Sequence, residues 1–170
     1  MRLLKFLPLI IFLVVSIFLY NKIKFQKTLE PLSSALIQKE LPELAVKNLN
    51  NDKTINEFIK NRFVIINIFA SWCAPCRVEH EVLKEFAKDY SIIGIAYKDS
   101  VENITSFFKE LGNPYDEVFY DFLGKASINL GLYGVPETFF VNKDGKILYK
   151  HVGPIKDEEF KKIAPMVFNK

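Results

Sequence analysis

The two cysteines of this chain lie close together, as Cys73 and Cys76 in the stretch ASWCAPCRVEH, residues 70–80. Two thiols separated by two residues can form a reversible disulfide, and this spacing is typical of thiol–disulfide exchange. In such a pair, one thiolate attacks the disulfide of another molecule and the second thiol resolves the mixed disulfide. The sequence therefore predicts a redox-active cysteine pair.

The predicted local structure gives the two cysteines different roles. Cys73 should lie at the N-terminus of a helix, where free N–H groups and the helix dipole favour a thiolate and lower the pKa of the thiol below about 8.5. Cys76 lies one turn inside that helix and should be less exposed. We therefore expect Cys73 to attack, or be attacked, and Cys76 to resolve the mixed disulfide.

Three other interpretations of the cysteines are weaker. A structural disulfide between Cys73 and Cys76 would close a very short loop, which stabilises a fold little in the loop-entropy account. A zinc site needs four ligands, and the two histidines, His80 and His151, lie far outside the usual H-x3-5-H spacing. Inert core thiols are the third alternative, and we favour the redox interpretation over all three.

A buried strand and an amphipathic helix should position the cysteine pair. Residues 63–69, FVIINIF, form an almost continuous run of β-branched and aromatic residues, which is typical of a strand buried on both faces. From residue 76 to residue 90, apolar residues recur every three or four positions, which predicts a helix. The pair therefore lies where a strand ends and a helix begins.

The first half of the predicted domain continues with the same alternation. Residues 91–97 predict a second buried strand, and residues 101–111 predict a second helix that Gly112 ends. This order implies parallel strands joined by right-handed crossovers. An insertion, residues 113–132, follows; we expect it to hold a short strand around 118–120 and a short helix around 124–130.

The second half of the domain should be antiparallel. Residues 138–141 and 147–152 are short apolar runs joined by the turn sequence Asn-Lys-Asp-Gly, residues 142–145. A last helix should follow the acidic residues 157–159, and Pro165 should end or kink it.

An apolar segment precedes the domain. Residues 6–20 carry no charge and have basic residues on both sides. We expect residues 1–21 to be an uncleaved signal-anchor transmembrane helix, residues 22–33 a polar linker, and residues 34–170 the folded domain. A cleaved signal peptide is the alternative, although no small-residue cleavage site follows the apolar run. Because lysines lie at both ends, the charges leave the orientation open.

The charge distribution argues against nucleic acid as a partner. The formal net charge is +3, but the first 30 residues hold five basic residues and one acidic residue. The rest of the chain has 18 basic and 19 acidic residues, a net charge of −1. The excess of positive charge therefore lies in the expected anchor and linker, where it can interact with lipid head groups.

Several motifs resemble a known family. The strand, the W-C-x-P-C loop, the next helix and Val135-Pro136 are similar to the thioredoxin superfamily. The stretches SALIQKELPEL, NIFASWCAPCRVEHEVL, GIAYKD, FFKELGNPY and LGLYGVPETFFVNKDGKILYKHVGPI together resemble the DsbE/CcmG family, membrane-anchored thiol:disulfide interchange proteins of cytochrome c maturation. The resemblance covers nearly all of residues 34–154.

The resemblance implies the fold class and the location. We expect an α/β, thioredoxin-like fold with a central mixed sheet flanked by helices and a cis Val135–Pro136 bond facing the cysteines. It also implies a single pass through the bacterial inner membrane, with the catalytic domain in the periplasm.

Two carboxylates are candidates for proton transfer. Asn67 occupies the position where thioredoxin keeps a buried aspartate that exchanges protons with the second cysteine, and an amide cannot take a proton. Glu79, one turn after Cys76, and Glu137, beside the predicted cis-proline, are available, and the resemblance also points to acidic residues there. We hypothesise that one of them accepts the proton of Cys76. Both should oppose thiolate formation at Cys73 and make the pair less oxidising.

Other residues are expected to contact the partner. Trp72 should cover the cysteine pair and offer a flat apolar contact to a partner peptide. The predicted contact set comprises Trp72, Pro75, Tyr133, Gly134, Val135 and Pro136. From the resemblance alone, residues 113–132 should shape a partner-facing groove. His80 could tune Cys76, but we expect a surface histidine.

The implied function is that of a dithiol reductant. Its substrate would be the haem-attachment disulfide of apocytochrome c, or a partner thiol protein, with electrons from a membrane thiol reductase of the DsbD/CcdA kind. No small-molecule cofactor and no metal are expected. A general TlpA/ResA-like reductase is the alternative enzyme. A Sco-like copper-delivery protein is less favoured because Sco proteins use C-x-x-x-C with a distant histidine, and a purely structural membrane-tethered binding module is the remaining option.

Overall fold

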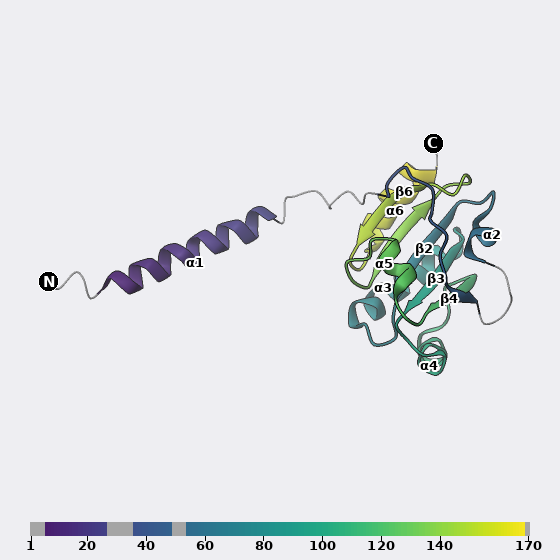
Figure 1. The fold of residues 1–170 in the computed structure, drawn as a ribbon, viewed down its shortest axis with the longest axis horizontal. Coiled ribbons are helices and arrows are strands. Elements are labelled where there is room, and N and C mark those ends of the chain that lie inside the picture. Colours follow the sequence, from purple (N-terminus) through teal and green to yellow (C-terminus); the bar gives the residue numbers. More distant parts are fainter. Residues whose placement is uncertain (1–5, 27–35, 49–53, 169–170) are drawn as a thin grey trace. The chain divides into compact units, whose positions relative to one another are not determined.

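The computed structural model describes residues 6–26, 36–48 and 54–168. Its contacts divide the chain into two units, Met1–Leu32 and Ser33–Lys170. The described part of the first unit is the helix α1 (Leu7–Gln26, Figure 1). No helix within the described residues is both long and apolar enough to cross a membrane. Most of the expected linker and the expected domain start at Ser34 lie outside the described residues.

The second unit is built on a six-stranded mixed sheet, as the resemblance implied, with strand order β1-β4-β3-β2-β5-β6 (Figure 1). The central strands β2, β3 and β4 run parallel. β5 is antiparallel to β2, β6 to β5, and β1 to β4. The strands are β1 (Lys47–Asn48), β2 (Val64–Phe69), β3 (Ile92–Tyr97), β4 (Glu117–Asp121), β5 (Glu137–Val141) and β6 (Ile147–Val152).

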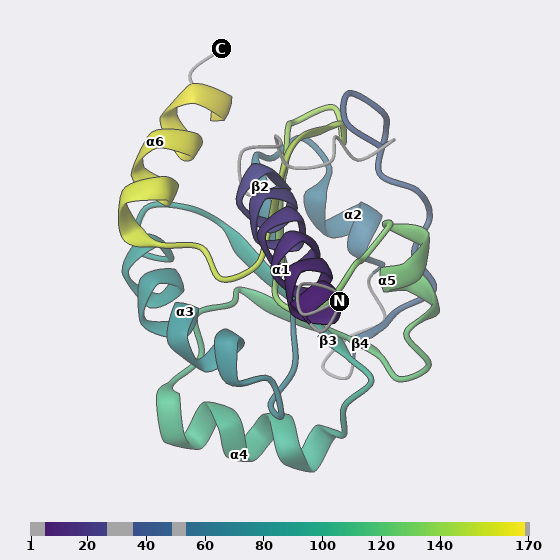
Figure 2. The same cartoon turned by 90° about the vertical axis from the view of Figure 1, so that its left-hand side faces the viewer.

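Two hydrophobic cores cover the two faces of the sheet. Ile65 and Phe69 of β2 belong to one core, with side chains of α3, α4 and α6, whereas Ile66 and Ile68 belong to the other, with α2 and α5. Figure 2 shows these two groups of helices on opposite sides of the sheet. β2 is buried along its whole length because helices cover both faces. The helices are α2 (Ile55–Ile59), α3 (Ala74–Phe86), α4 (Val101–Leu111), α5 (Lys125–Asn129) and α6 (Asp157–Phe168).

The predicted elements are present with small shifts at their ends. Gly112 ends α4 with a positive φ of 86°, as predicted. Pro165 lies inside α6 rather than at its end. Val167 is buried, and the Phe168 ring packs against Phe140 with centroids 5.8 Å apart, so apolar contacts hold the last turn against the core.

The insertion at residues 113–132 contributes to the sheet. The short strand and short helix that the sequence predicted here are present as β4 and α5. β4 pairs with β3 and β1. Gly124 precedes α5 with φ 74°, and a Cβ there would lie 2.6 Å from the side chains of Tyr97 and Lys98. The turn therefore requires glycine both for its backbone conformation and for close packing.

Candidate active site

The cysteine pair lies at the N-terminus of α3, as predicted. Cys73 is the N-cap residue and forms a disulfide with Cys76, with the two Cα atoms 5.3 Å apart. The backbone N–H of Cys76 donates to Cys73 Sγ at 3.1 Å. Because this donor and the helix dipole favour negative charge at the cap, they stabilise a thiolate on Cys73 when the pair is reduced. Both cysteines are buried, at 4% and 2% exposure, so their exposures differ little.

The end of β3 anchors the loop that carries Cys73. Asp99 Oδ2 accepts a hydrogen bond from the Ser71 N–H at 2.6 Å, and Trp72 Nε1 donates to the Lys98 carbonyl at 3.3 Å. Trp72 itself is 59% exposed, so much of its ring is open to a partner. Asp99 was missed in the sequence, where only its place after a buried strand could have indicated it.

The Val135–Pro136 peptide bond is cis, as the resemblance implied. Cys73 Sγ lies 3.5 Å from the Val135 carbonyl oxygen, so this loop faces the first cysteine. Tyr133 and Gly134 of the same loop are exposed, and so is Pro75 on the cysteine side. Val135 is partly buried and Pro136 is buried, so Tyr133 and Gly134 are the exposed members of the predicted contact set in this loop. The contact between Cys73 and Val135 brings together two segments that are far apart in the sequence.

Glu79 is a buried residue of α3, one helical turn after Cys76. It is 1% exposed, and its two carboxylate oxygens accept hydrogen bonds from Asn67 Nδ2 at 2.8 Å and from the Ile155 N–H at 3.0 Å. Burial raises the pKa of Glu79 to about 7, although both hydrogen bonds lower it. A carboxyl group with this pKa can take up and release a proton near neutral pH.

Three polar side chains hold the Asn67 amide in one orientation. Its Oδ1 accepts from the Tyr115 hydroxyl at 2.8 Å, and its Nδ2 donates both to Glu79 and to Thr138 Oγ1 at 3.1 Å. Asn67 therefore offers a donor, not an acceptor, to Glu79. Thr138 is the residue paired with Asn67 across β2 and β5, and a polar residue in each of two apolar strands was the signal in the sequence. No sequence signal singled out Tyr115.

Glu137 is also buried, but it is paired with a cation. Its Oε2 lies 2.9 Å from Lys150 Nζ, and its Oε1 accepts from the Tyr133 N–H at 2.9 Å. Lys150 was not among the predicted site residues, and the signal in the sequence was a lysine inside the largely apolar strand β6. Glu137 thus holds the loop before the cis-proline by a hydrogen bond from the Tyr133 N–H.

Comparison with known proteins identifies the family. The sequence pattern of the Redoxin family matches residues 36–166. The chain is 34% identical over 168 residues to the thiol:disulfide interchange protein DsbE of Vibrio cholerae, with 95% of this chain and 91% of that protein covered. The chain belongs to the Redoxin family, among the DsbE thiol:disulfide interchange proteins.

Further similarities agree with this family. The DsbE protein of Haemophilus influenzae is 35% identical over 169 residues, covering 96% of this chain and 93% of that protein. The thiol:disulfide interchange protein CycY of Rhizobium leguminosarum is 54% identical over 98 residues, covering 56% of this chain and 53% of CycY. A crystal structure of a DsbE-type protein from Chlorobium tepidum superimposes with TM-score 0.60 at 20% identity, covering 75% of this chain and 92% of that one, and supports the fold.

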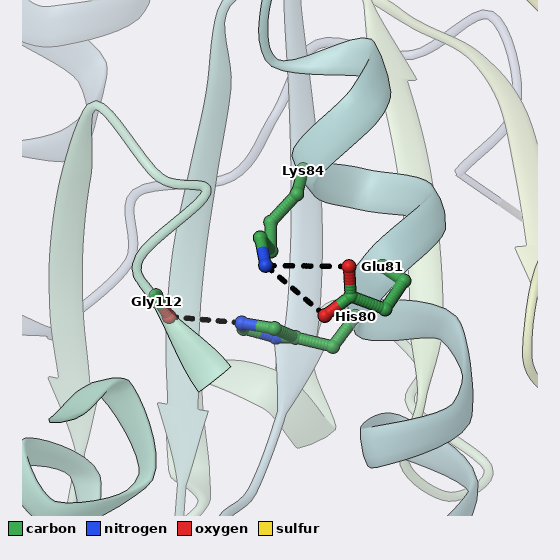
Figure 3. Close-up of polar contacts among 4 residues, drawn as sticks. All are labelled: His80, Glu81, Lys84 and Gly112. Atoms are coloured by element: carbon green, nitrogen blue, oxygen red, sulfur yellow. Dashed lines mark hydrogen bonds and ion pairs between the residues drawn. The ribbon is translucent and has the colours of Figure 1, made fainter. Parts of the chain in front are cut away.

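In this DsbE-family chain the prediction for His80 is wrong. His80 is 1% exposed, and its Nε2 lies 2.9 Å from the Gly112 carbonyl at the end of α4 (Figure 3). Because a carbonyl only accepts, Nε2 carries the hydrogen. Burial lowers the pKa of His80, so the ring is neutral near pH 7. Glu81 and Lys84, by contrast, form an ion pair with an Nζ–Oε1 distance of 3.0 Å on the exposed side of α3 (Figure 3).

The physical reason for this difference is the packing of α3 against α4. The last carbonyl groups of a helix have no partner within it, and the His80 ring supplies a donor to one of them. The ring also meets Phe107 edge-on, with centroids 4.8 Å apart.

The arrangement in this DsbE-family protein suits thiol–disulfide interchange. It has a redox disulfide at a helix N-terminus, a cis-proline loop facing the first cysteine, and a titratable carboxyl group one turn after the second. Among the side chains that the structure describes, no cluster of three or more His, Cys, Asp or Glu residues is placed to hold a metal ion.

Proposed function

We propose that this protein is a dithiol reductant of cytochrome c maturation, which reduces the haem-attachment disulfide of apocytochrome c or of a partner thiol protein. The observation that carries the proposal is the buried Glu79, whose pKa of about 7 allows it to accept a proton one helical turn after Cys76. The DsbE names of the relatives support the same role.

The proposed reaction moves two electrons from the cysteine pair to the partner. The Cys73 thiolate attacks one sulfur of the partner disulfide, which forms a mixed disulfide and releases the other partner sulfur as a thiolate. Cys76 then gives its proton to Glu79, and its sulfur attacks Cys73 Sγ. The Cys73–Cys76 disulfide forms, and the second partner sulfur leaves as a thiolate, so the partner is reduced and the pair is oxidised.

Of the two candidate carboxylates, we assign the proton transfer to Glu79. Glu137 forms an ion pair with Lys150 and accepts a hydrogen bond from the Tyr133 N–H, so both of its carboxylate oxygens are engaged in support of the loop before the cis-proline. Glu79 has no cation paired with it among the described residues, and its pKa of about 7 lies closer to that of a thiol than the ordinary carboxyl value of 4.5 does.

We also assign the partner surface to Trp72, Pro75 and the loop from Tyr133 to Pro136. Trp72 and Tyr133 are 59% and 63% exposed, and large exposed aromatic side chains are typical of binding sites. We extend this proposed surface to the insertion, which carries the exposed apolar side chains Phe122, Leu123 and Ile128.

For the location we propose the periplasmic side of the inner membrane, with residues 1–21 as the anchor and a DsbD/CcdA-type thiol reductase as the electron donor. In α1, apolar side chains such as Phe12 and Tyr20 are more than 60% exposed, which favours an apolar environment around that helix. A disulfide pair that cycles with other proteins also fits an oxidising compartment.

The first test is the reduction potential of the full-length chain, measured by equilibration with dithiothreitol and followed by Trp72 fluorescence. A reductant requires a value well below the range of disulfide isomerases, about −180 mV. A value near −120 mV, typical of a strong oxidant, would overturn the proposed function.

The second test addresses the substrate. The reduced chain should reduce a disulfide-bonded C-x-x-C-H peptide faster than insulin, and Cys73→Ala should abolish both reactions. Equal rates on the peptide and on insulin would favour a general reductase instead.

A further inference from the structure

Lys150 is a buried cation beside the active site. It lies on β6, and its side chain is 2% exposed. A buried ammonium group is costly unless it is paired and hydrogen-bonded, because it loses its hydration. The contacts that compensate for this cost therefore show what Lys150 holds in place.

Within the described residues, the Lys150 ammonium group contacts the loop of residues 131–136 and the first residues of β5. Its Nζ donates to the Gly131 carbonyl at 2.7 Å and lies 2.9 Å from Glu137 Oε2. The same Nζ lies 4.3 Å from the centre of the Tyr133 ring and 5.3 Å from that of Phe139. A cation at this distance from an aromatic ring is attracted to the ring face.

Glu137 completes the support of this loop. Its second oxygen accepts a hydrogen bond from the Tyr133 N–H at 2.9 Å. The ion pair therefore holds the loop at three groups: the carbonyl of Gly131, the N–H of Tyr133 and the ring of Tyr133. The loop is therefore held at Gly131 and Tyr133 from its buried side, while Tyr133 stays 63% exposed.

The supported loop is the one that faces the redox cysteine. It leads into Val135, whose carbonyl oxygen lies 3.5 Å from Cys73 Sγ. Displacement of Gly131 or Tyr133 would move this surface relative to the sulfur that the partner must reach. The chemistry at Cys76 and Glu79, by contrast, involves no contact with Lys150 in the described residues.

We propose that Lys150 is a positioning residue for partner binding: through Gly131, Tyr133 and Glu137 it holds the loop of residues 131–136 in the shape that receives a disulfide-bearing polypeptide. This inference rests on the proposed reductase function toward proteins. It assigns Glu137 to the support of the loop and leaves proton transfer to Glu79.

The test separates binding from chemistry by using two kinds of substrate. Steady-state rates of the full-length chain, which dithiothreitol returns to the reduced form after each turnover, are measured with a disulfide-bonded C-x-x-C-H peptide, with insulin, and with 2-hydroxyethyl disulfide, which is too small to span the loop. The rate of each substrate with dithiothreitol alone is subtracted. For Lys150→Met, we expect KM for the peptide to rise about tenfold, the size expected for loss of one charge-assisted contact. The rate with 2-hydroxyethyl disulfide should stay within about twofold of the wild type.

Two further variants control this result. Lys150→Arg keeps the charge and should recover most of the affinity for the peptide. A purely structural role of Lys150 gives no reason why Lys150→Met should affect the peptide but not 2-hydroxyethyl disulfide. Lys161→Met removes an exposed lysine that pairs with Asp157 at 2.8 Å, and it should leave both substrates unaffected.

The outcomes that overturn the inference are distinct from failure of the proposed function. An unchanged KM in Lys150→Met, or equal losses with all substrates, would reduce Lys150 to a structural role. If Lys150→Met does not fold because Glu137 is left unpaired, the double variant Lys150→Met/Glu137→Gln removes both charges, and a wild-type KM in that variant would overturn the inference. If the wild type shows no preference for the peptide over insulin, the cytochrome c assignment fails. The inference about Lys150 is then tested by comparing the effect of Lys150→Met on KM for insulin with its effect on the rate with 2-hydroxyethyl disulfide.

Discussion

The balance of forces on one carboxyl group decides the proton chemistry of this site. Burial favours the neutral form of Glu79, while the amide of Asn67 and the N–H of Ile155 favour the charged form. Asn67 can only donate to Glu79 because the Tyr115 hydroxyl occupies its oxygen. Tyr115 therefore acts on the proton acceptor through the orientation of an amide.

Tyr115→Phe should shift the pH dependence of the resolving step. Without the hydroxyl, the Asn67 amide can turn its oxygen toward Glu79, and this arrangement favours the protonated carboxyl group. We expect the midpoint of the rate of mixed-disulfide resolution to rise by about half to one pH unit, the size of one hydrogen-bond contribution. The measurement is rapid-mixing kinetics from pH 5 to pH 9.

Two controls accompany this prediction. Glu79→Gln should remove the midpoint near pH 7 and slow resolution, and Tyr149→Phe, which lies on β6 away from Asn67, should leave it in place. A Tyr115→Phe profile that superimposes on that of the wild type would show that the amide is held by Thr138 and Glu79 alone.

At the scale of elements, two parts of α3 have different roles. Its N-terminus carries the cysteine pair, while His80, in the middle of the helix, is directed at the end of α4 (Figure 3). The hydrogen bond from His80 to the Gly112 carbonyl joins two helices that cover the same face of the sheet. His80 therefore belongs to the packing of this layer.

His80→Ala should destabilise the fold without changing the redox chemistry. Loss of a buried ring and of one hydrogen bond should lower the free energy of unfolding by about 2–3 kcal/mol, in the oxidised and the reduced form alike. The neighbouring Glu81→Ala, which removes an exposed ion pair, should change it by less than about 0.5 kcal/mol. The measurement is urea unfolding; a shift in reduction potential in His80→Ala would instead assign His80 to the tuning of Cys76.

At the scale of the whole molecule, the sheet joins the parts of the site. β2 lies between β3 and β5, so the loop after β2 meets the loop before β5, and Asn67 meets Thr138. Contacts between Cys73 and Val135 and between Glu79 and Ile155 therefore depend on the same strand order. The stability of the fold therefore depends on the protonation of Glu79, a group of the active site.

This link predicts how stability depends on pH. The pKa of Glu79 is raised from 4.5 to about 7, so the folded chain binds this proton more tightly than the unfolded chain does. The contribution of Glu79 to the free energy of unfolding is largest below pH 4.5. It falls by about 3 kcal/mol in all as the pH rises through about 7. The free energy of unfolding, measured with urea at each pH for the wild type and for Glu79→Gln, should differ between the two chains by an amount that changes with pH in this way. Because both variants share the other titrating groups, a difference that does not change with pH would contradict the raised pKa.

The sequence by itself determined the elements and the chemistry that local patterns encode. An apolar β-branched run, a three-to-four periodicity and a C-x-x-C pair between them were enough to place the thiols at a helix N-terminus, and the resemblance added the cis-proline loop. These features depend on a few consecutive residues, and hydrophobic periodicity records them directly.

Only the tertiary structure decided which polar side chains are buried and what each one meets. Glu79 and His80 lie outside the apolar periodicity of α3, which predicts exposed positions for both. Both are buried because α4 and the segment after β6 pack over them. Lys150 pairs with Glu137 across β5 and β6, and Tyr115 reaches Asn67 from the insertion. Burial of a polar group depends on the partner that another element brings to it, and this partner is far away in the sequence.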